Sequence, residues 1–164
     1  MTVDAARVGI IVGSRSDLAT LEKATEALAG LGVGSETRVL SAHRSPALLD
    51  AYLADAESRG VEVYICAAGL AAHLPGVVAS GTVRPVIGVP MPGGVADGLD
   101  ALLSIVQMPR GVPVATVGVG NAVNAALLAA AILAVADEAL RERLVTYRDE
   151  QARAIADDPQ NQPA

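Results

Sequence analysis

The chain has 164 residues and a formal net charge of −6, with 52% hydrophobic and 2% aromatic residues. This length suits one ordinary domain, whose core must be built from alanine, valine, leucine and isoleucine. An acidic chain without a run of lysine or arginine repels polyanions, which excludes nucleic acid as an expected partner. A small phosphorylated ligand stays compatible with this charge, because a few local donors can hold it.

No basic stretch followed by a long apolar core opens the chain, so we expect no signal peptide and a cytoplasmic protein. The stretch Val112–Ala136 is almost free of charge and long enough to resemble a membrane span. Its interruptions, such as Pro113 and Gly118, divide it into two buried elements of ordinary size. The single cysteine, Cys66, lies in an apolar run and is predicted to be a buried, inert thiol, which excludes disulfides.

Short apolar runs alternate with helical patterns from the start of the chain. Val8–Val12 predicts a strand, and the apolar spacing over Leu18–Leu31 predicts a helix. A second extended run over Glu36–Leu40 is followed by a helix from Pro46 to about Arg59, with Ser45 as its N-cap.

The same alternation continues to the end of the chain. The remaining predicted strands are Val61–Ala67, Val86–Val89 and Val114–Val117, and the remaining helices are Leu74–Ala79, Asp97–Val106, Asn121–Ala136 and the charged Asp137–Ala156. Strict alternation predicts an α/β fold, in which a doubly wound parallel sheet has helices on both faces and a C-terminal helix is added. We expect one domain over residues 1–156 and a flexible tail over residues 157–164.

The helix predicted over Asn121–Ala136 is apolar on every side. Such a helix needs cover on all its faces, and a single domain of this size rarely supplies it. The cover is either the rest of this chain or another subunit, and the sequence leaves both open.

Polar and glycine-rich residues follow the first three predicted strands, over Gly13–Asp17, Ser41–Arg44 and Ala68–His73. Ligands of open parallel sheets bind at the carboxyl ends of the strands, where loops converge and helix N-termini point outward. Both histidines of the chain therefore lie at the edge where a ligand is expected.

The first of these loops offers the hydroxyls of Ser14 and Ser16 and the carboxylate of Asp17. With the amide of Gly13 they can bind a phosphate, and Asp17 can accept hydrogen bonds from ribose hydroxyls. Ser16 or Asp17 could equally cap the helix that follows.

The second and third loops carry the groups suited to chemistry. Arg44 can grip a phosphate through two hydrogen bonds, or it can be an ordinary surface arginine. Histidine side chains exchange protons near neutral pH, so His43 is a candidate general acid and base, although it could be a simple turn residue. His73 has small apolar neighbours that suit an uncharged molecule, or it is a buried histidine bonded to a carbonyl. The two histidines match no metal-ligand spacing, so no metal is expected.

Five segments recur together in a fixed order: GSRSD at Gly13–Asp17, SAHRSP at Ser41–Pro46, AAHLPG at Ala71–Gly76, SIVQMPRGVPVAT at Ser104–Thr116 and NAALLAA at Asn124–Ala130. Together they resemble the bacterial N5-carboxyaminoimidazole ribonucleotide mutases over roughly residues 7–150. The resemblance implies a flavodoxin-like three-layer fold and a homo-octamer with active sites at subunit contacts. It also implies an isomerase of de novo purine biosynthesis that converts N5-carboxyaminoimidazole ribonucleotide into 4-carboxy-5-aminoimidazole ribonucleotide without metal or organic cofactor.

The resemblance assigns a role to each matching residue. His43 moves the proton, Gly69 and His73 line a pocket for released carbon dioxide, and the loop Gln107–Pro109 helps to close a neighbouring active site. The residues implied to hold phosphate and ribose are Ser14, Ser16, Asp17, Ser41 and Arg44.

The sequence departs from the family pattern at two places, and two other functions are alternatives to this interpretation. Leu70 stands where the family usually has a second glycine, and the turn Gly118–Val123 is about two residues shorter than usual. One rival is the related carboxylase that uses aminoimidazole ribonucleotide and free carbon dioxide, whose members resemble AHK where this chain has Arg44. The other is a nucleotide-binding module without catalysis.

Overall fold

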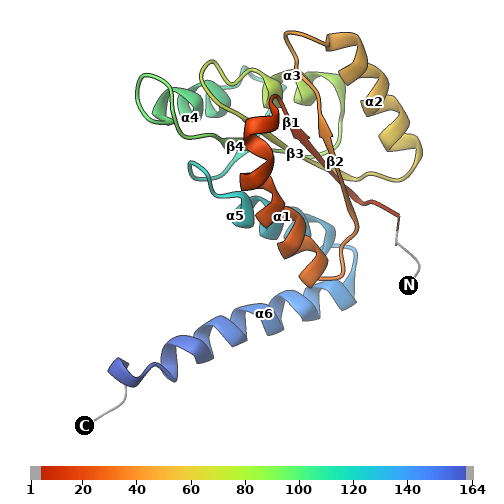
Figure 1. Cartoon of the computed structure of the whole chain (residues 1–164). Helices are drawn as coiled ribbons and strands as arrows, with labels where there is room; N and C mark the ends of the chain where they lie inside the picture. Colours follow the sequence, from red (N-terminus) through yellow and green to blue (C-terminus); the bar gives the residue numbers. More distant parts are fainter. Residues whose placement is uncertain (1–4, 162–164) are drawn as a thin grey trace.

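The structure, a computed structural model, describes residues 5–161. Within them, strands and helices alternate along the chain (Figure 1). The strands are β1 (Val8–Val12), β2 (Ser35–Val39), β3 (Val63–Ala68), β4 (Val86–Pro90) and β5 (Ala115–Thr116). The helices are α1 (Leu18–Gly30), α2 (Pro46–Ser58), α3 (Leu74–Gly81), α4 (Leu99–Val106), α5 (Ala122–Leu133) and α6 (Glu138–Ala156).

The strands form one sheet in the order β2-β1-β3-β4-β5, and every neighbouring pair is parallel. This order is that of flavodoxin-like doubly wound sheets, in which the chain begins near the middle and winds to both edges. The predicted fold class is therefore confirmed. All strands end at the same edge of the sheet, which brings together the loops after β1, β2, β3 and β4.

Two apolar clusters cover the two faces of the sheet. On one face Ile10 of β1 packs among side chains of α1 and α5. On the other face Ile11, the next residue, packs among side chains of α2, α3 and α4. Adjacent residues of a strand point to opposite faces, so a strand of continuous apolar residues supplies both clusters and produces three layers.

The thiol of Cys66 lies in the middle of β3 and is fully buried. Burial disfavours the charged thiolate and raises the pKa of this thiol well above its ordinary value. The expectation of an inert cysteine is thus supported by its surroundings.

Ser45 is the N-cap residue of α2 and Pro46 its first residue, as predicted. The Ser45 side chain makes no capping bond, because its Oγ donates to the carbonyl of Ser41 at 3.1 Å and accepts from the Ser41 amide at 3.1 Å. This hydroxyl holds the preceding loop together instead. The strand predicted over Val114–Val117 is shortened to the two residues of β5, at the sheet edge where only β4 offers a partner.

The last helix, α6, leaves the body of the sheet and projects from it (Figure 1). Arg7 anchors its start, because its guanidinium donates to Asp137 at 2.7 Å and to Glu62 at 2.6 Å. Leu140 is the buried residue of α6. Beyond the helix, Pro159–Asn161 forms a short 3-10 turn, residues 162–164 lie outside the described residues, and the flexible tail stays a prediction.

The helix α5 is the apolar one singled out from the sequence. Its alanines, such as Ala126 and Ala129, are fully buried against the sheet and α1, whereas Leu127 and Leu128 are partly buried. Among residues 5–161, none of the helices combines the length and the apolarity needed to cross a membrane.

Candidate active site

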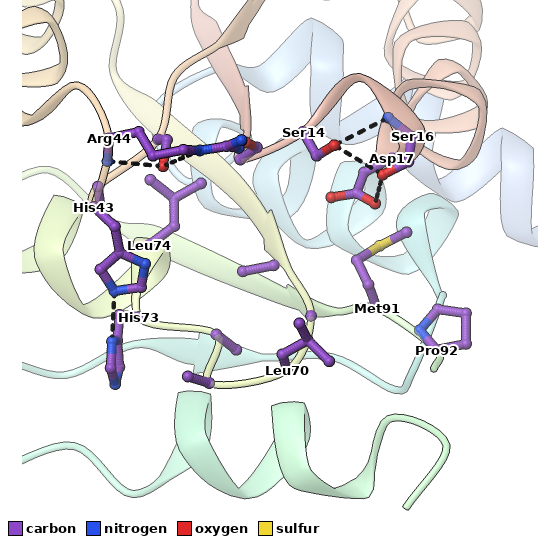
Figure 2. A pocket seen from close by; sticks show the side chains of 17 residues that line it. Ser14, Ser16, Asp17, His43, Arg44, Leu70, His73, Leu74, Met91 and Pro92 are labelled. Atoms are coloured by element: carbon purple, nitrogen blue, oxygen red, sulfur yellow. Dashed lines mark hydrogen bonds between the residues drawn. The ribbon is translucent and has the colours of Figure 1, made fainter. Parts of the chain in front are cut away.

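A cavity of about 590 Å³ opens at the carboxyl ends of β1 to β4 (Figure 2). Its wall is contributed by four loops that are far apart in the sequence. The lining residues are Gly13, Ser14, Ser16, Asp17, Ser41, Ala42, His43, Arg44, Ala68, Gly69, Leu70, Ala71, Ala72, His73, Leu74, Met91 and Pro92. Every residue predicted to bind substrate or to move a proton is in this set.

The loop after β1 gathers three oxygen-bearing side chains on one side of the cavity. Ser14 Oγ accepts from the Ser16 amide at 3.4 Å and from Ser16 Oγ at 3.0 Å. Ser16 Oγ also lies 3.0 Å from Asp17 Oδ1. Asp17 occupies the N-cap position of α1, one of the two alternatives left open by the sequence, but its side chain makes no capping bond to the helix. The capping side chain is Ser14, which caps the short 3-10 turn Arg15–Asp17.

Arg44 links the loops after β1 and β2. Its guanidinium donates to the carbonyl of Gly13 at 2.7 Å and to Ser41 Oγ at 3.3 Å. The Arg44 amide donates to the same hydroxyl at 3.2 Å. A second cavity of about 370 Å³ is lined by Arg44 together with Ser14 and Arg15. Arg44 is exposed, but its hydrogen bonds hold the guanidinium at the wall of two cavities that the Ser14 hydroxyl also lines, so a phosphate in either cavity can meet both groups.

The two imidazoles meet at one end of the cavity (Figure 2). His43 Nε2 lies 2.7 Å from His73 Nδ1, and the rings are nearly perpendicular, with an interplanar angle of 84°. One ring donates and the other accepts, according to their tautomers. Both residues are exposed. The alternative that His73 is a buried histidine bonded to a carbonyl is therefore wrong.

The third loop forms a tight turn on the side of the cavity opposite Ser14 and Arg44 (Figure 2). The Ala72 amide donates to the carbonyl of Gly69 at 3.0 Å. Leu70 and Ala72 both have left-handed backbone conformations, with φ of 57° and 44°. Non-glycine residues seldom adopt this conformation, and they are concentrated at functional sites.

Leu74, one of the small group of apolar neighbours of His73 in the sequence, lines the cavity, and sequence reasoning missed two further lining residues, Met91 and Pro92. Met91 and Pro92 follow β4, so the rule that ligands bind at the carboxyl ends of parallel strands could have found them. The loop Gln107–Pro109 does not line this cavity. Met108 instead lines a third cavity of about 250 Å³, whose wall also includes His73. Its expected contact with a neighbouring subunit stays a prediction.

Residues 5–161 contain no group of three or more histidine, cysteine, aspartate or glutamate side chains that could hold a metal ion. The polar wall of the cavity consists of hydroxyls, one carboxylate, one guanidinium and two imidazoles. These groups suit a phosphorylated sugar and a proton transfer, and the fold and the site together are those of an α/β protein with a cavity suited to a small phosphorylated ligand at the carboxyl ends of its strands.

Comparison with known proteins identifies the family. The model of the AIR carboxylase family matches residues 7–154, so this chain belongs to that family. It is 54% identical over 150 residues to the N5-carboxyaminoimidazole ribonucleotide mutase of Mycobacterium tuberculosis, which covers 92% of this chain and 86% of the relative. It is also 53% identical over 148 residues to the chloroplastic phosphoribosylaminoimidazole carboxylase of Vigna aconitifolia, covering 90% of this chain and 27% of that protein.

A solved structure agrees with the fold described above. The crystal structure of Treponema denticola PurE superimposes with a TM-score of 0.87 at 30% sequence identity, covering 96% of this chain and 98% of the other. The family resemblance drawn from the five sequence segments is confirmed.

Proposed function

We propose that this chain is an isomerase of purine biosynthesis, which converts N5-carboxyaminoimidazole ribonucleotide into 4-carboxy-5-aminoimidazole ribonucleotide, with His43 as the residue that moves the proton. The mutase activity follows from the family and from relatives of about half identical sequence. One observation supports the assignment of His43. Its imidazole lines the same cavity as the Ser14 hydroxyl and the guanidinium of the adjacent Arg44, which a hydrogen bond to Gly13 holds in place.

The substrate phosphate and ribose are assigned to the polar side of the cavity. Arg44 and Ser14 can donate to phosphate oxygens, and Asp17 can accept from ribose hydroxyls. Two further hydroxyls, of Ser16 and Ser41, complete this side. The hydrogen bonds that join Ser14 to Ser16 and Arg44 to Ser41 support the assignment, because they hold these polar groups close together on one side of the cavity.

The reaction needs a group that gives one proton and takes back another. When the bond between the exocyclic nitrogen and the carboxyl carbon breaks, its electron pair stays on nitrogen, carbon dioxide leaves, and His43 supplies a proton to that nitrogen. The ring carbon then attacks carbon dioxide, and His43 removes the proton that this carbon carried. Atoms and charge balance, and the imidazole returns to its starting state, so no external acid, base or cofactor is consumed.

Released carbon dioxide must stay beside the ring between these steps. The apolar surroundings of Gly69 and the adjoining side chains support a compartment for an uncharged molecule, and His73 can donate one hydrogen bond to it. Enclosure of the reacting fragments then takes the place of a metal or an organic cofactor in this proposal.

We further propose that the protein works as a homo-oligomer, an octamer, with sites at subunit contacts. Three large apolar side chains of α4, Leu99, Leu103 and Val106, are about half exposed, at 51%, 46% and 49%. They recur at helical spacing and so form one apolar face beside the cavity. A second copy of the chain would cover this face. The cytoplasmic location expected from the sequence stays a prediction.

The decisive experiment supplies each substrate separately to the purified protein and follows the ultraviolet absorbance. Conversion of the carbamate substrate without added bicarbonate is the expected result. Activity only on aminoimidazole ribonucleotide plus bicarbonate would assign the chain to direct carboxylation. Binding of the nucleotide without either conversion would indicate a non-catalytic module.

A further inference from the structure

The imidazole rings of His43 and His73 form a pair at one end of the cavity. The distance from His43 Nε2 to His73 Nδ1 is 2.7 Å, and the two rings are nearly perpendicular. Within residues 5–161, neither ring has another hydrogen-bond partner. Each ring is therefore oriented by the other.

The short distance limits where the protons of this pair lie. A hydrogen bond needs one donor and one acceptor, so only one of the two facing nitrogens carries a proton. When His43 acts as an acid it is an imidazolium, which is a donor at both of its nitrogens. In that form His73 Nδ1 has to be the acceptor, and a neutral His73 then carries its own proton on Nε2.

The same geometry decides which nitrogen of His43 is left for the substrate. Its Nε2 is occupied by His73. Figure 2 shows the other ring nitrogen, Nδ1, on the side of the ring that faces the remaining residues of the cavity wall. A proton exchanged with a ligand in the cavity therefore passes through Nδ1.

We propose that His73 is a positioning residue: it accepts the hydrogen bond from His43 Nε2 and so makes Nδ1 the nitrogen that gives and takes the substrate proton. This inference rests on the proposed function. In the acid step, Nδ1 of the imidazolium gives its proton to the exocyclic nitrogen of the substrate. In the base step, the vacant Nδ1 takes the proton from the ring carbon. Nε2 keeps its proton and His73 stays neutral throughout, so protons and charge balance between His43 and the substrate.

A neutral acceptor suits this cycle. A hydrogen bond from a charged donor is stronger than one between neutral groups, so His73 stabilises the imidazolium form of His43. The bond also fixes the rotation of a ring that belongs to an exposed residue. In Ser-His-Asp sites a carboxylate orients the histidine, whereas the carboxylate of this cavity wall, that of Asp17, lies 3.0 Å from Ser16 Oγ. The second imidazole takes the place of that carboxylate.

The proton between the rings can be observed directly. The chain has two histidines, so nitrogen-15 NMR of protein labelled at histidine shows these two rings, and the spectrum of His73→Asn assigns them. At about pH 8, where a free imidazole is neutral, we expect a protonated His43 Nε2 coupled across the hydrogen bond to an unprotonated His73 Nδ1. A proton on His73 Nδ1, or no coupling between the rings, would overturn the proposal.

Two variants of His73 separate the acceptor from the shape of the side chain. His73→Phe keeps a planar ring without an acceptor, and we expect kcat to fall by about 10- to 100-fold while KM changes by less than about threefold. His73→Asn keeps an oxygen that can accept at the position of Nδ1, and its kcat should stay within about threefold of the unaltered value. An unchanged kcat in His73→Phe, or an equal fall in both variants, would overturn the proposal. Thermal unfolding measures the folded fraction, so that turnover is compared per folded molecule.

Two further results distinguish this inference from the function on which it rests. Conversion by the unaltered protein, together with the opposite arrangement of the proton, would overturn the role of His73 and leave the mutase activity standing. Absence of conversion by the unaltered protein would overturn the proposed function and, with it, the use of the pair in proton transfer.

Discussion

The interior of the sheet and the edge at which its strands end differ in chemistry and in backbone conformation. Strands β1 and β3 are buried along their whole length, and no polar or charged residue in the described part of the chain is buried. At the edge, hydroxyls bond to hydroxyls, the two imidazoles bond to each other and a guanidinium bonds to a backbone carbonyl, and the three non-glycine residues Leu70, Ala72 and Asp97 have left-handed backbones. The fold thus places its stability in one region and its chemistry in another.

This separation predicts that substitutions in the two regions have different effects. A change at the edge should alter binding or turnover while the free energy of unfolding stays nearly constant. A change in the interior should lower the free energy of unfolding while the protein that remains folded keeps its turnover number. Substitutions in the two regions therefore test whether chemistry and stability are independent.

The largest effect is expected for His43→Asn. Asparagine keeps a polar side chain but cannot give and take a proton near neutral pH, so turnover should fall by about a thousandfold or more. Nucleotide affinity should stay within about tenfold, or about 1.4 kcal/mol, because the phosphate and ribose contacts remain. Ultraviolet assays and isothermal titration calorimetry measure the two quantities. Turnover that is unchanged would refute the proton-transfer role.

In the interior, Ile10→Ala should show the converse behaviour. Ile10 is fully buried in β1 among side chains of α1 and α5, so the lost methyl groups leave a cavity and the free energy of unfolding should fall by about 2–5 kcal/mol. Urea denaturation measures the change, with Val83→Ala, at a residue 99% exposed, as the control. A fall in turnover number as large as that of His43→Asn in the folded variant would show that the two regions are coupled.

The same contrast explains what could be predicted from the sequence. The interior depends on apolar runs that are continuous in the chain, so the sheet and its helices could be predicted with boundaries shifted by a few residues. β5 was overextended because two residues at a sheet edge, with one neighbouring strand, give only a weak apolar signal. The edge was predicted from the rule that strands of a parallel sheet end together.

The contacts within the site could not be predicted, because they join residues far apart in the chain. Nothing in the sequence indicates that His43 meets His73, or that Arg44 reaches the carbonyl of Gly13. The sequence also leaves open which side chain makes a capping bond in this loop. Serine and aspartate can both cap helices, and the three-dimensional structure shows that Ser14 caps the 3-10 turn while Asp17, at the N-cap position of α1, makes no side-chain bond to that helix.

A smaller effect is expected for Arg44→Ala. Loss of a guanidinium that binds phosphate should weaken nucleotide binding by about 10- to 100-fold, and Arg44→Lys should recover only part of the affinity because it lacks the planar fork. The free energy of unfolding should change by less than about 0.5 kcal/mol, as for other exposed residues. Isothermal titration calorimetry measures the nucleotide affinity. Arg148→Ala, which removes an exposed arginine of α6, is the control. Equal affinity in Arg44→Ala would contradict the phosphate role.

The smallest effect concerns an ion pair remote from the site. Hydrogen bonds from Arg59, at 2.7 and 3.1 Å, hold the pKa of Glu36 below its ordinary value of about 4.5. A carboxylate with a lowered pKa stabilises the fold above its ordinary pKa, and this stabilisation is lost as the pH falls through the lowered value. Glu36→Gln should therefore lower the free energy of unfolding by about 0.5–1 kcal/mol at pH 7, and the difference should shrink as the pH falls below about 4. Urea denaturation at several pH values measures this difference in the free energy of unfolding, with Glu22→Gln as the control. A difference that persists in acid would mean that packing, and not the charge of Glu36, is responsible.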